Sequence, residues 1–127
     1  MITVIKSPFV QYKLTILRNK KTSNTVFRQT MNEISYLIAS DVLQYVPFKK
    51  QTIETPLKKM SGTALGQPII LVPILRAGLG LLEGFAKFLP EAEKGHIGLY
   101  RDEQTYEPVE YLFKLPRVKN KKVLILD

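Results

Sequence analysis

The first third of the chain carries apolar residues at helical spacing. The segment from Ser7 to Arg18 has a serine at the N-cap, a proline at the first helical position and an apolar face formed by Val10, Leu14 and Leu17. A second, longer helix is predicted to begin at Ser23 or Asn24 and to stop before Pro47, with an apolar face made of Phe27, Met31, Ile34, Ile38 and Tyr45. Two consecutive helices therefore open the chain.

The pattern then changes to strands. Thr52–Thr55 and Met60–Leu65 flank a proline and a lysine pair, which predicts a hairpin arm. Ile69–Leu75 is a continuous, branched apolar run, typical of a strand buried on both faces of a parallel sheet, and Pro73 within it suggests an edge position or an early end to the ladder.

Glycines follow this run, and then a helix is predicted through Leu81, Leu82, Phe85 and Leu89 up to Pro90. Further strands are expected at His96–Tyr100, Tyr111–Leu115 and Val123–Leu126. Strand, glycine-rich turn, helix and strand form a βαβ unit, so we predict an α/β fold with a right-handed crossover.

Composition excludes several classes of protein. The chain has 127 residues, about one domain, and is 45% hydrophobic and 24% charged, as expected for a folded core. Without cysteine, and with His96 as the single histidine, it holds neither a disulfide scaffold nor a thiolate zinc site. The most apolar window is too short for a bilayer span of about 20 residues, and Met1–Val10 does not read as a signal peptide, so we expect a cytoplasmic protein.

The charge of the chain is strongly basic but unevenly distributed. The net charge is +8, and most of the excess lies before Met60. The lysine pairs Lys20-Lys21, Lys49-Lys50 and Lys58-Lys59 are isolated and do not alternate with aromatic residues. A basic nucleic-acid-binding module remains an alternative, but solvated helix and hairpin faces explain the lysines, and we expect no dedicated nucleic-acid surface.

The turn after the buried strand contains Gly78, Gly80 and Gly84. Glycines between a strand and a helix let the backbone approach an anion. The spacing misses the dinucleotide fingerprint by one place, because Glu83 stands where the third glycine belongs, although Asp102 lies about 20 residues on, where a ribose ligand is expected. A dinucleotide-binding domain and a tight turn without a ligand are both open alternatives.

Two arginines favour a phosphate ligand over an empty turn. Arg76 ends the buried strand and Arg101 ends the next one, and open α/β sheets bind ligands at the carboxyl ends of their strands. Guanidinium groups suit bidentate phosphate contacts, so both side chains could converge on one polyphosphate.

Three ordered motifs resemble uracil phosphoribosyltransferase, namely Val72–Gly80 (VPILRAGLG), Gly95–Glu103 (GHIGLYRDE), and Glu107–Tyr111 followed by Lys114-Leu115-Pro116. The opening of the chain resembles the same family through Tyr12-Lys13-Leu14, Leu17-Arg18 and Phe27-Arg28. The resemblance covers essentially the whole chain.

The resemblance implies a type I phosphoribosyltransferase fold with a mostly parallel sheet, flanking helices and a protruding β-hairpin arm. It also implies synthesis of UMP and pyrophosphate from uracil and phosphoribosyl pyrophosphate, with Mg²⁺. The residues that match the family's phosphoribosyl pyrophosphate site are Arg76, Ala77, Gly78, Arg101 and Asp127. No catalytic side chain and no protein metal ligand is assigned.

The resemblance further implies how the chain is organised. Residues 1–127 correspond to the N-terminal portion of a single domain, with a helical region at 7–46, the arm at about 51–65 and an α/β core at 68–127. The arm is expected to join two copies into a homodimer, and GTP is a candidate effector.

Some family features are not matched. The family's phosphate loop follows the position of Asp127, and its uracil-reading segment comes later, so we expect this chain to match the N-terminal three-fifths and not to turn over by itself. Ser7 and Tyr12 stand where many members carry histidine. His96 is expected in the core or behind a site residue rather than as a general base. Asp102 and Glu103 could reach magnesium through water or serve as caps and ion-pair partners.

Overall fold

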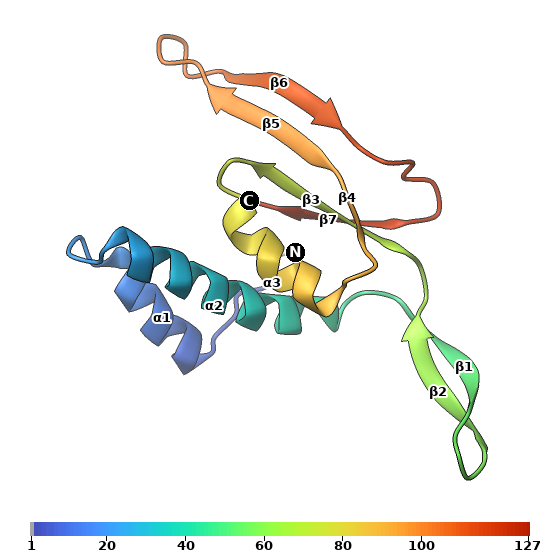
Figure 1. Ribbon diagram of the computed structural model, residues 1–127. Coiled ribbons are helices and arrows are strands. Elements are labelled where there is room, and N and C mark those ends of the chain that lie inside the picture. The colour runs from blue at the N-terminus through green and yellow to red at the C-terminus, as the bar shows by residue number, and fades with distance from the viewer. Residues whose placement is uncertain (1) are drawn as a thin grey trace.

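The structure is a computed structural model that describes residues 2–127, so Met1, which the predicted domain includes, lies outside the described residues. Figure 1 shows the elements, which follow in the order α1 (Pro8–Arg18), α2 (Asn24–Leu43), β1 (Phe48–Glu54), β2 (Lys59–Leu65), β3 (Ile69–Leu75), α3 (Leu79–Phe88), β4 (Glu93–Lys94), β5 (His96–Arg101), β6 (Pro108–Lys114) and β7 (Lys122–Leu126).

The two N-terminal helices form where the apolar spacing predicts them. Helix α1 follows Ser7 with a proline in its first turn. Helix α2 is capped by Ser23, whose hydroxyl accepts a hydrogen bond from the backbone N–H of Val26 at 3.3 Å. Tyr45 was wrongly placed on the apolar helix face, because α2 ends at Leu43 and the tyrosine is 68% exposed in the turn before Pro47.

The main sheet is mixed and mostly parallel, as predicted. Strand β3 pairs in parallel with β7 on one side and with β4 and then β5 on the other, and β6 adds to β5 in antiparallel register. The short strand β4 was not predicted from the sequence. The α/β fold class is confirmed.

Strand β3 occupies the centre of the sheet, so the edge position suggested by Pro73 was wrong. Pro73 pairs with Leu126 of β7. On the opposite side, β3 pairs with β4 at Ile70 and Leu71 and resumes with β5 at Ile74. The missing N–H of proline thus falls where the ladder is interrupted, which allows proline in a central strand.

The helices pack as a stack on one side of the sheet, with α1 against α2, α2 against α3 and α3 against β3 (Figure 1). The core between them contains Ala39, Val46, Ile69, Leu71, Phe85, Leu89 and Leu126. The β1–β2 arm and the β5–β6 hairpin project from opposite ends of the molecule. Among the described helices, none combines the length and apolar character needed to cross a membrane.

Candidate functional site at the end of the central strand

The turn after β3 consists of Arg76, Ala77 and Gly78. The backbone N–H of Gly78 donates to the carbonyl of Ile74 at 2.8 Å, and the N–H of Leu79 donates to the carbonyl of Arg76 at 3.1 Å. The peptide bond between Leu75 and Arg76 is cis. Arg76 and Ala77 are exposed, whereas Gly78 is buried.

Two backbone amides of this turn are available to a ligand. Within residues 2–127, the N–H groups of Arg76 and Ala77 donate no hydrogen bond to another part of the chain. Backbone amides next to a helix N-terminus are suited to an anion, and the first turn of α3 contains no acidic side chain. The turn therefore presents two unbonded amides and one exposed arginine side chain.

Gly78 fixes the turn against the end of β7. A Cβ atom on Gly78 would lie 2.1 Å from the carbonyl oxygen of Leu126 and 2.7 Å from the backbone nitrogen of Ile74. No side chain fits there, so glycine is required by the close approach of two backbone segments. Asp127, which is exposed, directly follows Leu126. The structure thus brings three predicted site residues, Ala77, Gly78 and Asp127, to one edge of the sheet together with Arg76.

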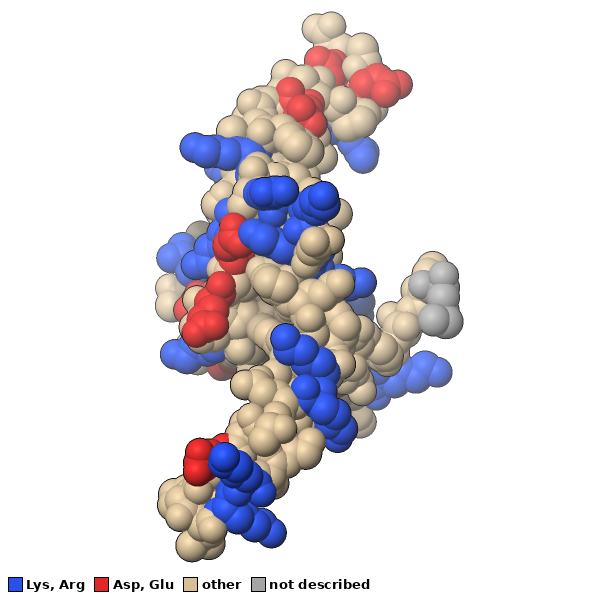
Figure 2. Space-filling model, turned by 90° about the vertical axis from the view of Figure 1, so that its right-hand side faces the viewer, with Lys and Arg blue, Asp and Glu red and all other residues tan. Residues whose placement is uncertain are grey.

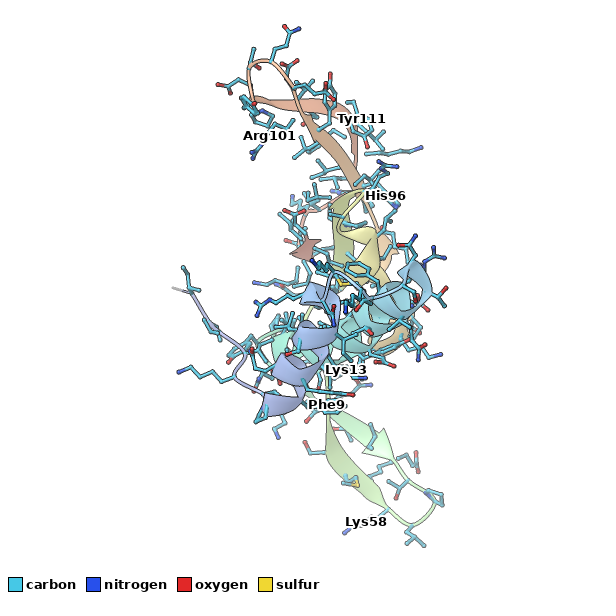
Figure 3. All side chains as sticks on the ribbon, turned by 90° about the vertical axis from the view of Figure 1, so that its left-hand side faces the viewer. Phe9, Lys13, Lys58, His96, Arg101 and Tyr111 are labelled. Atoms are coloured by element: carbon cyan, nitrogen blue, oxygen red, sulfur yellow. The ribbon has the colours of Figure 1, made fainter. Side chains whose placement is uncertain are left out.

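Arg101 ends the neighbouring strand but lies farther out. Leu75, the last residue of β3, pairs with Gly98, and Arg101 ends β5 three residues beyond that pair, about 10 Å along the strand. Figure 3 shows Arg101 near the outer end of the β5–β6 hairpin and His96 at its base. The shared edge is established by the strand pairing, and contact of both arginines with one ligand stays a prediction.

Asp102 closes the loop of the β5–β6 hairpin. Its Oδ1 accepts hydrogen bonds from the backbone N–H groups of Thr105 at 2.8 Å and Gln104 at 2.9 Å and from the Thr105 hydroxyl at 3.2 Å. The Thr105 amide, followed by the Gln104 amide, holds the pKa of Asp102 below its usual value. Of the roles left open for Asp102, capping is the one that its contacts support.

Gly80 and Gly84, which lie in α3, have a packing role. A Cβ on Gly80 would lie 3.0 Å from Cγ of Met31, and a Cβ on Gly84 would lie 2.2 Å from Oγ of Ser35. Both glycines let α3 approach α2 closely. The dinucleotide-binding hypothesis rested on the glycine spacing and on Asp102 as a ribose ligand. The glycines contact a helix and Asp102 caps a loop, so neither feature supports that hypothesis.

The other features considered in the sequence, namely Ser7, Tyr12, His96 and the overall distribution of basic side chains, do not mark a binding site within the described residues. Ser7 precedes α1 without a side-chain capping bond, and Tyr12 is 57% exposed beside Phe9. His96 is half-buried at the start of β5 rather than part of the inner core. On the face shown in Figure 2, basic side chains are spread over much of the molecule with acidic ones between them. That distribution is not the continuous basic stripe typical of a nucleic-acid surface.

Sequence reasoning missed the free amides and the orientation of the turn. The composition of Arg76–Gly78 allows an anion site, but which N–H groups remain unbonded depends on the path of the backbone. The signal available in the sequence was Gly78, a glycine directly before a helix. The reason for that glycine, its close approach to Leu126, becomes visible only in the folded structure.

The chain matches a known protein family over nearly its whole length. Residues 4–127 match the family model described as uracil phosphoribosyltransferase. A curated protein named uracil phosphoribosyltransferase from Levilactobacillus brevis is 45% identical to this chain, over 98% of the chain and 60% of the relative. A protein of the same name from Streptococcus mutans is 44% identical with the same coverage. The chain therefore spans about 60% of the length of these curated relatives.

A solved structure shows the same fold. The AQ2163 protein from Aquifex aeolicus superposes with a TM-score of 0.90 at 33% identity, over 100% of this chain and 62% of that protein. The match extends from the N-terminal helices to β7, and it includes the turn and the end of β7 described above. Together with the family model over residues 4–127, these relationships show that the chain belongs to the uracil phosphoribosyltransferase family.

Proposed function

We propose that this protein serves the transfer of a phosphoribosyl group from phosphoribosyl pyrophosphate to uracil, which gives UMP and pyrophosphate in pyrimidine salvage. Family membership and the names of the curated relatives support this reaction. The observation that carries the proposal is the placement of the Arg76–Gly78 turn directly against the end of β7, next to Asp127. An anion-binding turn and a carboxylate for ribose hydroxyls thereby meet at one edge.

The reaction needs electrostatic support more than a protein nucleophile. A uracil ring nitrogen forms a bond to the anomeric carbon as the bond from that carbon to the diphosphate oxygen breaks, and the proton of the ring N–H passes to solvent water. Negative charge collects on the departing diphosphate. Arg76 and the amides of Arg76 and Ala77 would hold that charge, and Arg101 would bind the same group from the neighbouring strand.

The residues present fit a Mg²⁺ ion that binds together with the substrate phosphates rather than in a cage of protein ligands. Within the described residues, no three His, Asp or Glu side chains gather as a metal cage. Mg²⁺ in phosphate enzymes is commonly held by one or two carboxylates together with substrate phosphates, and Asp127 offers an exposed carboxylate beside the turn. When bound, the ion would neutralise diphosphate charge, and the exposed carboxylate of Asp127 would be available to hold it together with the substrate phosphates.

The finer features are also proposals. Leu57, at the tip of the arm, is 95% exposed, and a second copy of the chain would cover it in a homodimer. The regions 7–46, 51–65 and 68–127 would act as parts of one domain in the cytoplasm. GTP is proposed as an effector on the family resemblance alone.

Thermal unfolding tests the proposed function. Phosphoribosyl pyrophosphate with Mg²⁺ should raise the melting temperature, because a ligand at 100 times its Kd stabilises the folded state by about 2.7 kcal/mol. Arg76→Ala should lose most of the shift, and Lys58→Ala, which removes a charge at the arm tip seen in Figure 3, should retain it. Stabilisation by a nicotinamide dinucleotide instead, or steeply salt-dependent RNA binding, would favour one of the alternative functions.

A further inference from the structure

Helices α2 and α3 run side by side in the same direction. Gly80 of α3 faces Met31 of α2, and Gly84, one turn later, faces Ser35, also one turn later. The contacts thus advance together along both helices, and Figure 1 shows the two ribbons running in the same direction. The start of α3, and the turn before it, therefore lie beside the first two turns of α2.

A hollow of about 460 Å³ separates these two helix starts. Asn24, Phe27 and Arg28 line it from α2, and Ala77 and Gly80 line it from the other side. No acidic side chain is among its lining residues. Ala77 belongs both to this hollow and to the turn with unbonded amides, so the hollow adjoins the site proposed for the diphosphate.

Arg28 brings an unpaired cation to the hollow. Across residues 2–127, its guanidinium takes part in no ion pair and no side-chain hydrogen bond. The nearest acidic residue along α2, Glu33, is held elsewhere, because Lys13 Nζ donates to its Oε2 at 2.5 Å and Gln29 donates to its Oε1 at 3.2 Å. Arg28 is exposed, so no burial cost opposes its charge.

We propose that Arg28 is a further ligand of the diphosphate, reaching it across the hollow from α2 while Arg76 and the amide of Ala77 hold it from the turn. The inference rests on the proposed function and adds a residue from a different part of the fold. A diphosphate carries more negative charge than one arginine neutralises, and guanidinium groups bind phosphate oxygens in pairs. Arg28 thereby links the position of α2 to substrate binding.

An NMR titration of the ¹⁵N-labelled 127-residue chain with inorganic pyrophosphate and Mg²⁺ tests this. The amide signal of Ala77 and the Nε signal of Arg28 should shift with one common Kd. Arg28→Gln should raise the Kd at the Ala77 amide at least about tenfold, which corresponds to about 1.4 kcal/mol. Lys58→Gln, an equal loss of charge at the arm tip, should change it less than about twofold.

The outcomes separate the two proposals. If the Ala77 amide still responds in Arg28→Gln with the Kd of Lys58→Gln, Arg28 does not bind the diphosphate and the proposed function stands. If the Ala77 amide of the unsubstituted chain does not respond to pyrophosphate, both proposals fail. Unchanged amide signals in the core strands show that each variant is folded, which is expected for an exposed position.

Discussion

Gly78 lies so close to Leu126 that no side chain fits between them, since a Cβ atom on Gly78 would stand 2.1 Å from the Leu126 carbonyl oxygen. The turn after β3 and the end of β7 are thus built against each other. Asp127 directly follows Leu126, and Arg76 and Ala77, whose backbone amides are unbonded, directly precede Gly78. The close packing of the turn against β7 therefore requires glycine at position 78.

Replacing Gly78 with alanine should destabilise the fold. The obstructing atoms belong to the backbone and cannot rotate away, so Gly78→Ala should lower the free energy of unfolding by about 1 to 3 kcal/mol, as other overpacked sites do. Urea unfolding followed by circular dichroism measures this. Gly62→Ala is the matched control, because its Cβ would meet Cδ1 of Ile53 at an ordinary 3.4 Å. Equal stability losses in the two variants would contradict the close contact at Gly78.

Hydrophobic pattern predicted most of the elements but not how β3 is paired. The branched run Ile69–Leu75 indicates a buried strand because both of its faces are apolar. Whether that strand is central depends on β7, at the far end of the chain, and on the interruption between β4 and β5. The edge position suggested by Pro73 was therefore wrong, whereas the alternative of an early end holds on one side, because the β3–β7 ladder ends at Pro73.

The site was partly predictable for a similar reason. Arg76, Arg101 and Asp127 each follow an apolar strand, so the sequence locates them at one edge of a parallel sheet. The roles of Gly80 and Gly84 could not be read the same way, because they depend on α2 packing against α3. Spacing alone cannot separate glycines that approach a ligand from glycines that approach a helix.

Asp102 should titrate at unusually low pH. The backbone amides of Thr105 and Gln104 stabilise its carboxylate, so the pKa lies below the ordinary value of 3.8. Because the folded-state pKa is the lower one, the stabilisation is present above the unfolded-state value and is lost as the pH falls through the folded-state value. The effect is thus confined to acid below about pH 4, and stability at neutral pH does not change with it.

The carboxyl ¹³C signal of Asp102, followed by NMR from about pH 6 to pH 2, measures this shift. The amide signal of Thr105 should move with the same midpoint, since that N–H donates to Oδ1. In strong denaturant the midpoint should return to the ordinary aspartate value. A folded-state midpoint at or above 3.8 would show that the loop does not hold the carboxylate.

The arm should govern self-association if the proposed homodimer forms. Leu57 is 95% exposed, and burial of one leucine side chain contributes about 1.5 to 3 kcal/mol. Leu57→Ser should therefore raise the dimer Kd at least about tenfold, as measured by sedimentation velocity. Tyr106→Ser, at a 71% exposed position on the other projecting hairpin, should leave the Kd unchanged. A monomeric unsubstituted chain, or equal effects of the two variants, argues against the arm as the interface.

Arg76 and Arg101 should act on the same ligand, although Arg101 lies three residues beyond Gly98, the β5 partner of Leu75. Each alanine substitution should weaken binding of phosphoribosyl pyrophosphate with Mg²⁺ by about 1.5 to 3 kcal/mol, the contribution of hydrogen bonds to a charged group. Two side chains that share one diphosphate are coupled, so calorimetry on both single variants and the double variant should give an interaction energy of about 0.5 to 3 kcal/mol. Pairing Arg76→Ala with Lys58→Ala provides the uncoupled reference. Strictly additive changes in binding free energy for the two arginines would contradict a shared diphosphate and would exclude Arg101 from that site.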